Sequence, residues 1–169
     1  MTDKVVIITG GSRGIGRATA LAAAARGFRV VVGYVSNKKA ADEVVSHIEA
    51  KNGKAIAVKC DVGSEKDILD LFSAADDFGT LGALVNNAGI IGTTSRVDAM
   101  SVERIQRMMA VNVTGSMLCA REAVKRMSTR HGGKGGVIVD LSSVAAKLGS
   151  PNTYVDYAAS KGAIDSFTI

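Results

Sequence analysis

The sequence predicts an α/β protein: a single domain in which helices cover both faces of a doubly wound parallel sheet. Three observations support this fold class. Short apolar runs rich in β-branched residues alternate with helical stretches along the whole chain. No composition break or repeat divides the 169 residues, and 47% hydrophobic residues are enough for one core. Buried parallel strands joined by right-handed crossovers then leave the doubly wound sheet as the leading topology.

The first half of the chain alternates strand and helix. The apolar run Val5–Thr9 predicts a first strand, and the alanine-rich stretch Ile15–Arg26 predicts the helix that follows a glycine-rich turn. A second β-branched run, Arg29–Val35, precedes a helical stretch over Lys38–Lys51. Gly53 is predicted to end that helix, because glycine is common just after a helix C-terminus.

The second half repeats this alternation. Ala55–Cys60 predicts a third strand, and Ser64 has the position of an N-cap for the next helix. The remaining predicted elements follow in chain order: a helix over Glu65–Phe78, a strand over Ala83–Asn86, a long helix over Val102–Arg130, a strand over Gly136–Leu141 and a last helix from Tyr154 or Asp156 onward.

The composition argues against several classes of function. Although the formal net charge is +5, the 21 basic residues are scattered, and no basic stripe alternates with aromatics as nucleic-acid binding would favour. The most apolar stretch, Ala18–Ala25, is too short to cross a bilayer. His47 and His131 stand alone, so no metal site is expected. Two unpaired cysteines and no signal sequence predict a reduced, cytoplasmic protein.

The turn between the first strand and helix has the composition of a phosphate-binding loop. It reads Thr9-Gly10-Gly11-Ser12-Arg13-Gly14-Ile15-Gly16. Glycines allow the backbone to approach a pyrophosphate closely, and the following helix N-terminus offers free N–H groups and a favourable dipole. The predicted cofactor-binding residues of this turn are Gly10, Ser12, Arg13, Gly14, Ile15 and Gly16. Three glycines in a turn are weak evidence alone, but their place between strand and helix favours a Rossmann-type dinucleotide site.

The spacing Thr-Gly-x-x-x-Gly-x-Gly resembles the coenzyme turn of the short-chain dehydrogenase/reductase family. Five further elements of that family follow in the same order: Asp61-Val62, Asn86-Asn87-Ala88-Gly89, Asn112, Ser142-Ser143 and Tyr157-x-x-x-Lys161. The resemblance implies that Asp61 and Val62 contact the adenine. It also implies that Asn87, Ala88 and Gly89 lie beside the adenine ribose.

The resemblance covers nearly the whole chain and implies a role for it. Residues 1–169 are expected to form the dinucleotide-binding and catalytic domain, without the last strands and the substrate lid of the family. The implied activity is hydride transfer between NADP(H) and a small-molecule carbonyl or alcohol. Family members often assemble through the helix expected at Val102–Arg130, which has apolar residues on more than one side. A homodimer or homotetramer is therefore expected. From the composition, no nucleic-acid or membrane partner is expected.

Tyr157 and Lys161 are four residues apart and therefore share one face of the last helix. A phenol has a pKa of about 10, which a neighbouring ammonium lowers, so the pair suits proton transfer to or from a substrate oxygen. The family resemblance adds that Lys161 also binds the nicotinamide ribose, and it places both Tyr157 and Lys161 among the cofactor-binding residues. Outside this context, such a pair is usually a surface feature.

Two more residues complete the implied proton relay. Ser143 is expected to orient the substrate oxygen; it precedes Tyr157 by fourteen residues where the family has thirteen, and the extra residue is placed in the loop Lys147–Thr153. Ser142 is the alternative. Asn112 continues an apolar helical series and should face inward. It is either a core amide satisfied by neighbouring backbone or, as the family implies, a residue that loosens the helix and holds a water linking Lys161 to solvent.

The end of the second strand predicts NADP rather than NAD. NAD-binding members place an acidic residue there, whereas this chain has Tyr34, Val35, Ser36 and Asn37 and no acid before Asp42. Tyr34, Ser36 and Asn37 are therefore assigned to the cofactor site, and Lys38 is a further candidate. Arg13 would bind the 2′-phosphate through charge-assisted hydrogen bonds; alternatively, it only covers the surface. The rival functions are a non-catalytic NADP-binding sensor and an interaction fragment without cofactor.

Overall fold

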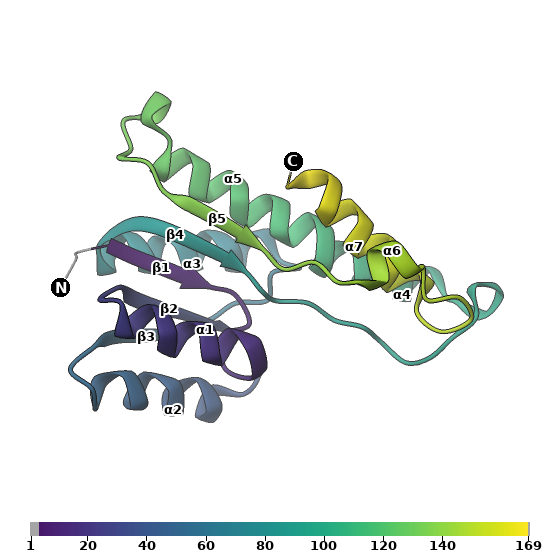
Figure 1. Cartoon of the computed structure of the whole chain (residues 1–169), viewed down its shortest axis with the longest axis horizontal. Helices are drawn as coiled ribbons and strands as arrows, with labels where there is room; N and C mark the ends of the chain where they lie inside the picture. The colour runs from purple at the N-terminus through teal and green to yellow at the C-terminus, as the bar shows by residue number, and fades with distance from the viewer. Residues whose placement is uncertain (1–3, 169) are drawn as a thin grey trace.

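The computed structural model describes residues 4–168 and contains one five-stranded parallel sheet (Figure 1). The strands are β1 (Lys4–Ile8), β2 (Arg29–Tyr34), β3 (Lys54–Lys59), β4 (Thr80–Asn86) and β5 (Val137–Asp140). Their order in the sheet is β3-β2-β1-β4-β5. The chain therefore moves outward from β1 on one side and returns to the other side with β4. In such sheets ligands bind where the order reverses, outside the carboxyl ends of the strands.

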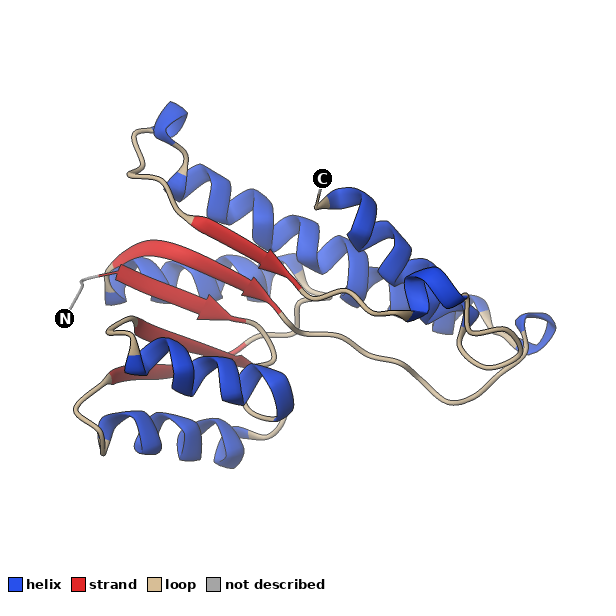
Figure 2. Ribbon diagram, viewed as in Figure 1, coloured by secondary structure: helices blue, strands red, loops and turns tan. Residues whose placement is uncertain are grey.

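Helices cover both faces of the sheet (Figure 2). On one face lie α1 (Gly14–Ala25) and α2 (Lys38–Glu49), and on the other lie α3 (Glu65–Phe78) and α5 (Gly115–Met127). Alternate residues of β1 enter different clusters: Val6 and Ile8 pack with Val44 and Ile48 of α2, whereas Val5 and Ile7 pack against the α3 side. This alternation is the two-residue period of a strand buried on both faces. The predicted fold class, a doubly wound Rossmann-type sheet, is confirmed.

The long helix predicted over Val102–Arg130 is not continuous. It consists of α4 (Val102–Met109), a π-helical turn η2 (Ala110–Thr114) and α5, and a separate 3-10 turn η3 (Thr129–His131) follows. The widened turn surrounds Asn112, whose buried amide bonds to the backbone of Ile90. Such π-turns mark places where a side-chain requirement interrupts the regular helical ladder.

Further differences concern short elements and helix ends. The helix predicted over Lys38–Lys51 ends at Glu49, and the left-handed residue after it is Asn52, with a φ of 61°, rather than Gly53. The stretch after Ser143 contains a short helix α6 (Ala145–Leu148), so the loop assigned to Lys147–Thr153 begins later than expected. The last helix, α7 (Val155–Phe167), begins between the two predicted starts, and a 3-10 turn η1 (Val97–Ala99) precedes α4. None of the helices within residues 4–168 is long and apolar enough to cross a membrane.

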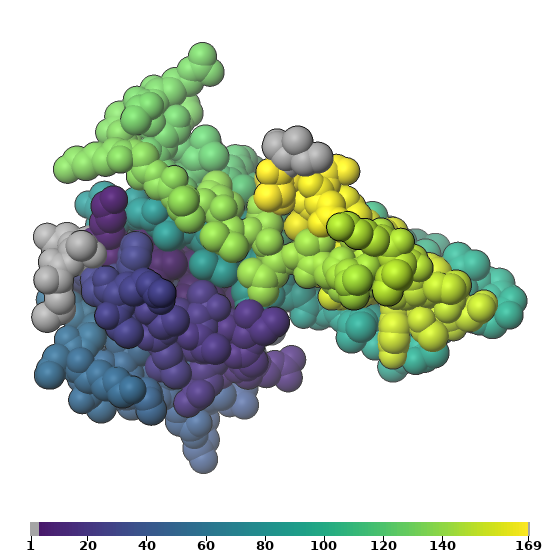
Figure 3. All heavy atoms as spheres, viewed as in Figure 1, coloured from purple at the N-terminus to yellow at the C-terminus, as the bar shows by residue number. Residues whose placement is uncertain are grey.

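Helices α4, α6 and α7 lie together beyond the carboxyl ends of β4 and β5 (Figure 1). In the space-filling view this group, with the loop that follows β4, projects from the body that contains the sheet (Figure 3). The segment that contains Tyr157 therefore stands next to the edge of the sheet at which a ligand would bind.

Candidate functional site

The glycine turn adopts the conformation that its composition predicts. Gly10 and Gly14 have φ angles of +63° and +54°, in the left-handed region that favours glycine. At Gly16 the constraint is space, because a Cβ there would lie 2.4 Å from the carbonyl oxygen of Gly10 and 2.5 Å from Nδ2 of Asn87. Gly16 therefore holds α1 close to the turn and lies behind the surface that a cofactor would touch.

Polar contacts join the turn after β1 to the segment after β4. The Thr9 hydroxyl oxygen accepts from the backbone N–H groups of Asn87 at 3.1 Å and Ala88 at 3.0 Å. The Asn87 amide donates from Nδ2 to the carbonyl oxygens of Thr9 at 2.8 Å and Gly10 at 3.0 Å. Both side-chain N–H bonds of Asn87 are thus used to hold the turn, which leaves only its oxygen to face a ligand.

A cleft of about 660 Å³ opens at this edge of the sheet, between the ends of β1, β2, β3 and β4. Its volume lies in the range of small-molecule and cofactor sites. The lining includes these residues of the predicted cofactor set: Gly10, Ser12, Arg13, Gly14, Ile15, Tyr34, Ser36, Asn37, Asp61, Val62, Asn87, Ala88 and Gly89. Of that set, Gly16, Tyr157 and Lys161 do not line the cleft. The cradle of left-handed glycines at a helix N-terminus suits a pyrophosphate.

The end of the cleft near α2 has no carboxylate from β2. Tyr34 packs its ring into the core beside α2 and is 8% exposed. The Asn37 side chain accepts from the N–H of Ala40 at 2.9 Å, which caps α2 and occupies part of its hydrogen-bonding capacity. Lys38, the further candidate, pairs with Asp42 at 2.6 Å on the exposed surface. Among the described residues Arg13 has no ion-pair partner, and it is exposed at the rim.

The structure adds Arg107 to the cleft. This α4 side chain lines the cleft and donates from Nη2 to Oδ2 of Asp61 at 2.7 Å. Asp61 thus faces the cleft as half of an ion pair rather than as an isolated carboxylate. Nothing in the sequence pattern points to Arg107, because 46 residues separate it from Asp61 and only the tertiary fold brings α4 over the end of β3.

Lys161 belongs to α7, and its side chain reaches the end of β5 and the loop after β4. Its Nζ donates to the Leu141 carbonyl oxygen at 2.5 Å and lies 5.8 Å from the ring centroid of Tyr157. Burial lowers the pKa of Lys161, and the nearby carboxylate of Asp140 opposes that shift. A Cβ at Gly89 would lie 3.8 Å from Nζ of Lys161 and 3.3 Å from Oδ1 of Asn112. The cleft and the Tyr157 helix therefore meet at Gly89.

Asn112 is buried and fully engaged by protein groups. Its Oδ1 accepts from the N–H of Ile90 at 2.8 Å, and its Nδ2 donates to the carbonyl oxygen of Ile90 at 2.9 Å. Nδ2 also donates to the hydroxyl of Ser160 at 3.0 Å, and that hydroxyl donates to the carbonyl oxygen of Tyr157 at 2.7 Å. These contacts fit Asn112 as a core amide satisfied by backbone, and they also connect it to α7. The π-turn around it fits the other interpretation, that Asn112 loosens the helix.

The two serines after β5 have different hydrogen bonds. The Ser142 hydroxyl donates to the backbone carbonyl of Lys161 at 3.2 Å, so its proton is already used. The Ser143 oxygen accepts from the N–H of Ala145 at 3.2 Å at the start of α6. The Ser143 proton is therefore left to donate to another group, which favours Ser143 for contact with a substrate oxygen.

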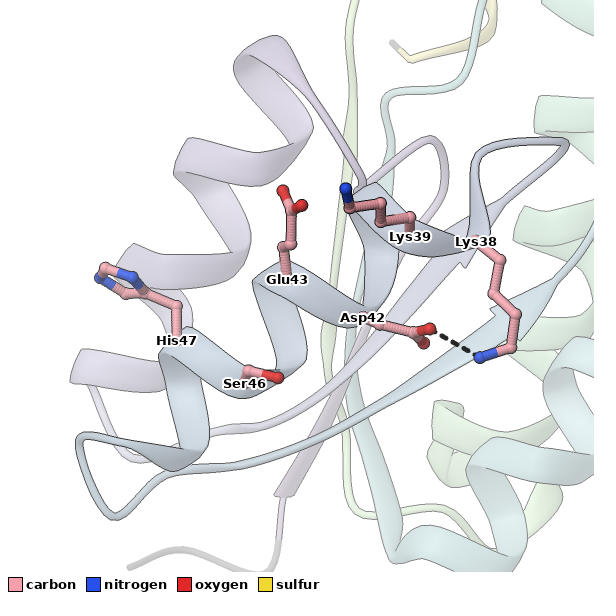
Figure 4. Close-up of a pocket in the computed structure, with 6 residues that line it drawn as sticks. All are labelled: Lys38, Lys39, Asp42, Glu43, Ser46 and His47. Carbon is pink, nitrogen blue, oxygen red and sulfur yellow. Dashed lines mark hydrogen bonds and ion pairs between the residues drawn. The ribbon is translucent and has the colours of Figure 1, made fainter.

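The described residues offer little support for metal or thiol chemistry. No group of three or more His, Cys, Asp or Glu side chains gathers there as a metal site would require. Burial raises the pKa of the Cys60 thiol to about 12, so this thiol stays protonated and is a poor nucleophile. A shallow hollow on α2 is lined by Lys38, Lys39, Asp42, Glu43, Ser46 and His47. Their side chains spread along one exposed helix, and among those drawn in Figure 4 only Lys38 and Asp42 are joined.

Residues 4–169 match the family model described as short chain dehydrogenase. The chain belongs to the short-chain dehydrogenase family. It is 53% identical over 165 residues to the uncharacterized oxidoreductase YgfF of Escherichia coli strain K12, covering 97% of this chain and 67% of that protein. It is 40% identical over 169 residues to a 3-oxoacyl-[acyl-carrier-protein] reductase of Synechocystis, covering 99% of this chain and 66% of the relative.

Among solved structures, the chain resembles a short-chain dehydrogenase from Burkholderia cenocepacia that was determined in complex with NADP. The TM-score is 0.89 at 35% identity, with 99% of this chain and 66% of that chain covered. This short-chain dehydrogenase sequence thus spans about two thirds of the length of its relatives. The cleft described above lies within the shared part.

Proposed function

We propose that residues 1–169 are the dinucleotide-binding and catalytic domain of an NADP-dependent oxidoreductase acting on a carbonyl or alcohol substrate. The observation that carries the proposal is the junction at Gly89. There the glycine-lined cleft meets the side chains of Asn112 and Lys161, within one helical turn of Tyr157. The Burkholderia relative, solved with NADP, supports the choice of cofactor class. When bound, NADP(H) supplies or accepts the hydride.

The chain's own residues would then handle the proton. In reduction, Tyr157 donates its phenolic proton to the substrate oxygen, and in oxidation it accepts that proton. The Lys161 ammonium stabilises the phenolate that remains. Ser143 donates a hydrogen bond that orients the substrate oxygen. Asn112 holds the Ile90 backbone and Ser160, and through them it supports the position of α7.

The alternative is a cofactor-binding sensor without catalysis. The presence of Ser143, Tyr157 and Lys161 together favours the enzyme, because binding alone has no need of a proton donor. Titration of NADPH into the chain, followed by NADPH oxidation with carbonyl substrates by the complete protein, tests the proposal. Binding without turnover of 3-oxoacyl thioesters, sugars or small ketones would favour the sensor, and absence of binding would leave the interaction fragment.

Arg107 should contribute to the affinity for both cofactors. In Arg107→Gln the Asp61 carboxylate loses its partner and faces an anionic dinucleotide. We expect NADPH and NADH to bind about threefold more weakly, the size of effect typical of a partly exposed ion pair. Fluorescence titration of both cofactors measures this. A loss confined to NADPH would contradict it, because Asp61 is proposed to face the adenine that both cofactors share.

We also propose a homodimer or homotetramer that uses the exposed side of α4 and α5. Met108 and Met127 of this region enter the core, but another set of apolar side chains is at least 39% exposed: Val102, Ile105, Met109, Met117 and Val124. Large exposed apolar surfaces mark interaction sites, and these side chains recur along α4 and α5. Met117→Lys in the complete protein should shift the light-scattering mass toward the monomer, whereas Ser46→Lys on α2 should not. A monomeric wild type at micromolar concentration would refute the proposal.

A further inference from the structure

The helix that carries Tyr157 begins without a side-chain cap. Tyr154 is the N-cap residue of α7, and its side chain makes no capping hydrogen bond. The first turn instead contains Asp156, the neighbour of Tyr157, with only 4% of its side chain exposed. A carboxylate at a helix N-terminus is stabilised by the dipole, but a buried one also needs a partner. What binds Asp156 therefore also determines where the first turn of α7 lies.

That partner is Arg104 of α4, whose side chain is 17% exposed. Its guanidinium donates two hydrogen bonds to the carboxylate, from Nε to Oδ2 at 2.8 Å and from Nη2 to Oδ1 at 3.2 Å. The Arg104 hydrogen bond, assisted by the N–H of Tyr157, holds the pKa of Asp156 below its usual value in spite of burial. Asp156 is thus an anion that touches both Arg104 and the backbone of Tyr157.

The same guanidinium reaches a third segment. Nη1 of Arg104 donates to the carbonyl oxygen of Thr93 at 2.6 Å, in the loop that continues from Gly89. A backbone bond from Ser95 N–H to the Thr153 carbonyl oxygen at 2.9 Å joins this loop to the start of α7. One cation thus connects α4, α7 and the loop that follows the cleft. These segments form the projection beyond the carboxyl ends of the strands (Figure 1).

The burial of this pair distinguishes it from the neighbouring charges. Arg96 and Asp98, in the same region, form an ion pair at 3.1 Å with 68% and 66% of their side chains exposed. An exposed pair contributes little, whereas breaking a buried pair leaves an uncompensated charge. Two parallel hydrogen bonds fix the relative orientation of Arg104 and Asp156 in addition to the distance between them.

We propose that Arg104 and Asp156 are positioning residues, whose ion pair fixes the first turn of α7, and with it the Tyr157 phenol, against the loop after β4. The proposal rests on the function proposed above for Tyr157. Neither residue lines the cleft, so the pair acts on the reacting geometry rather than on cofactor binding. A displacement of about 1 Å at a reacting group can reduce a rate by up to about 100-fold.

The test compares two variants. Asp156→Asn keeps the shape of the side chain and removes its charge, and Arg104→Lys keeps the charge and loses the pair of parallel hydrogen bonds. Asp98→Asn is the matched control in the exposed pair. In the complete protein, well below the melting temperature of each variant, we expect kcat to fall about five- to twentyfold in both, with the NADPH Kd within about twofold of wild type. Hydrogen exchange of residues 154–161 should quicken in both, and the control should change neither quantity.

Several outcomes would overturn the proposal. They are an Asp156→Asn kcat close to wild type, a loss of kcat explained by weaker NADPH binding, or unchanged exchange at residues 154–161. If the single variants do not fold, Arg104→Gln with Asp156→Asn removes both charges and avoids an unpaired one. That double variant should fold and remain slow, and wild-type kcat would show that the pair is not needed for positioning. A wild type that never oxidises NADPH refutes the proposed function instead, and the exchange measurement still decides the ion pair's effect on α7.

Discussion

Tyr157→Phe is expected to lower kcat of the complete protein at least about 100-fold, because general acid–base catalysis contributes about 10²–10⁴-fold. The substitution removes only the hydroxyl that exchanges the proton with the substrate oxygen. Tyr157 does not line the cleft, so the NADPH affinity should remain nearly that of wild type. Steady-state kinetics together with cofactor titration separate the two quantities.

Tyr154→Phe is the matched control for that experiment. Tyr154 lies at the same end of α7, but its hydroxyl accepts a hydrogen bond from the Thr94 hydroxyl at 3.0 Å. Tyr154 precedes Tyr157 by three residues, so the residue four positions after Tyr154 is Ala158 rather than Lys161. Its loss should therefore affect kcat far less. A Tyr157→Phe variant that keeps more than a tenth of the wild-type kcat would remove Tyr157 as the proton donor.

Arg13→Ala is expected to weaken NADPH binding about tenfold, as the loss of a charge-assisted bond to a phosphate implies, and to leave NADH binding nearly unchanged. Arg13 is the exposed N-cap residue of α1 at the rim of the cleft, where it can meet the 2′-phosphate that NADH lacks. Exposure to salt limits the effect, so the titrations are made at one low ionic strength. Arg17→Ala, one turn further along α1 and outside the cleft lining, is the matched control.

The converse substitution, Tyr34→Asp, should shift the preference toward NADH. A carboxylate at the end of β2 can bind the ribose hydroxyls and repels the phosphate. Since Tyr34 is 8% exposed and packs in the core, the variant should also melt at a lower temperature. The binding ratio is therefore measured where the variant is folded. The NADP assignment is wrong if wild type binds NADH as tightly as NADPH, or if Arg13→Ala weakens both alike.

Much of the fold could be predicted because the relevant signals are local. Four of the five β-strands lie largely within a predicted apolar run, since a strand buried on both faces needs continuous apolar residues, whereas β4 begins at Thr80, before its predicted start at Ala83. The prediction of one continuous helix over Val102–Arg130 was wrong, because helical periodicity does not reveal the π-turn at Asn112; only the family resemblance implied that this residue loosens the helix. That turn reflects two bonds to Ile90, 22 residues away. Helix α6 was missed because four residues carry too short a periodic signal.

For the candidate site, the sequence by itself determined which residues are available: the glycine turn, the acid-free end of β2, and Ser143 and Tyr157 with Lys161 at helical spacing. These depend on chain separations of a few residues, over which covalent geometry decides what is near. Only the tertiary structure decided that Arg107 forms an ion pair with Asp61 and that Arg104 forms one with Asp156. Those partners are 46 and 52 residues apart. Their meeting depends on how the helix containing Asn112 crosses the carboxyl ends of the strands, because packing of whole elements, rather than local spacing, brings such side chains together.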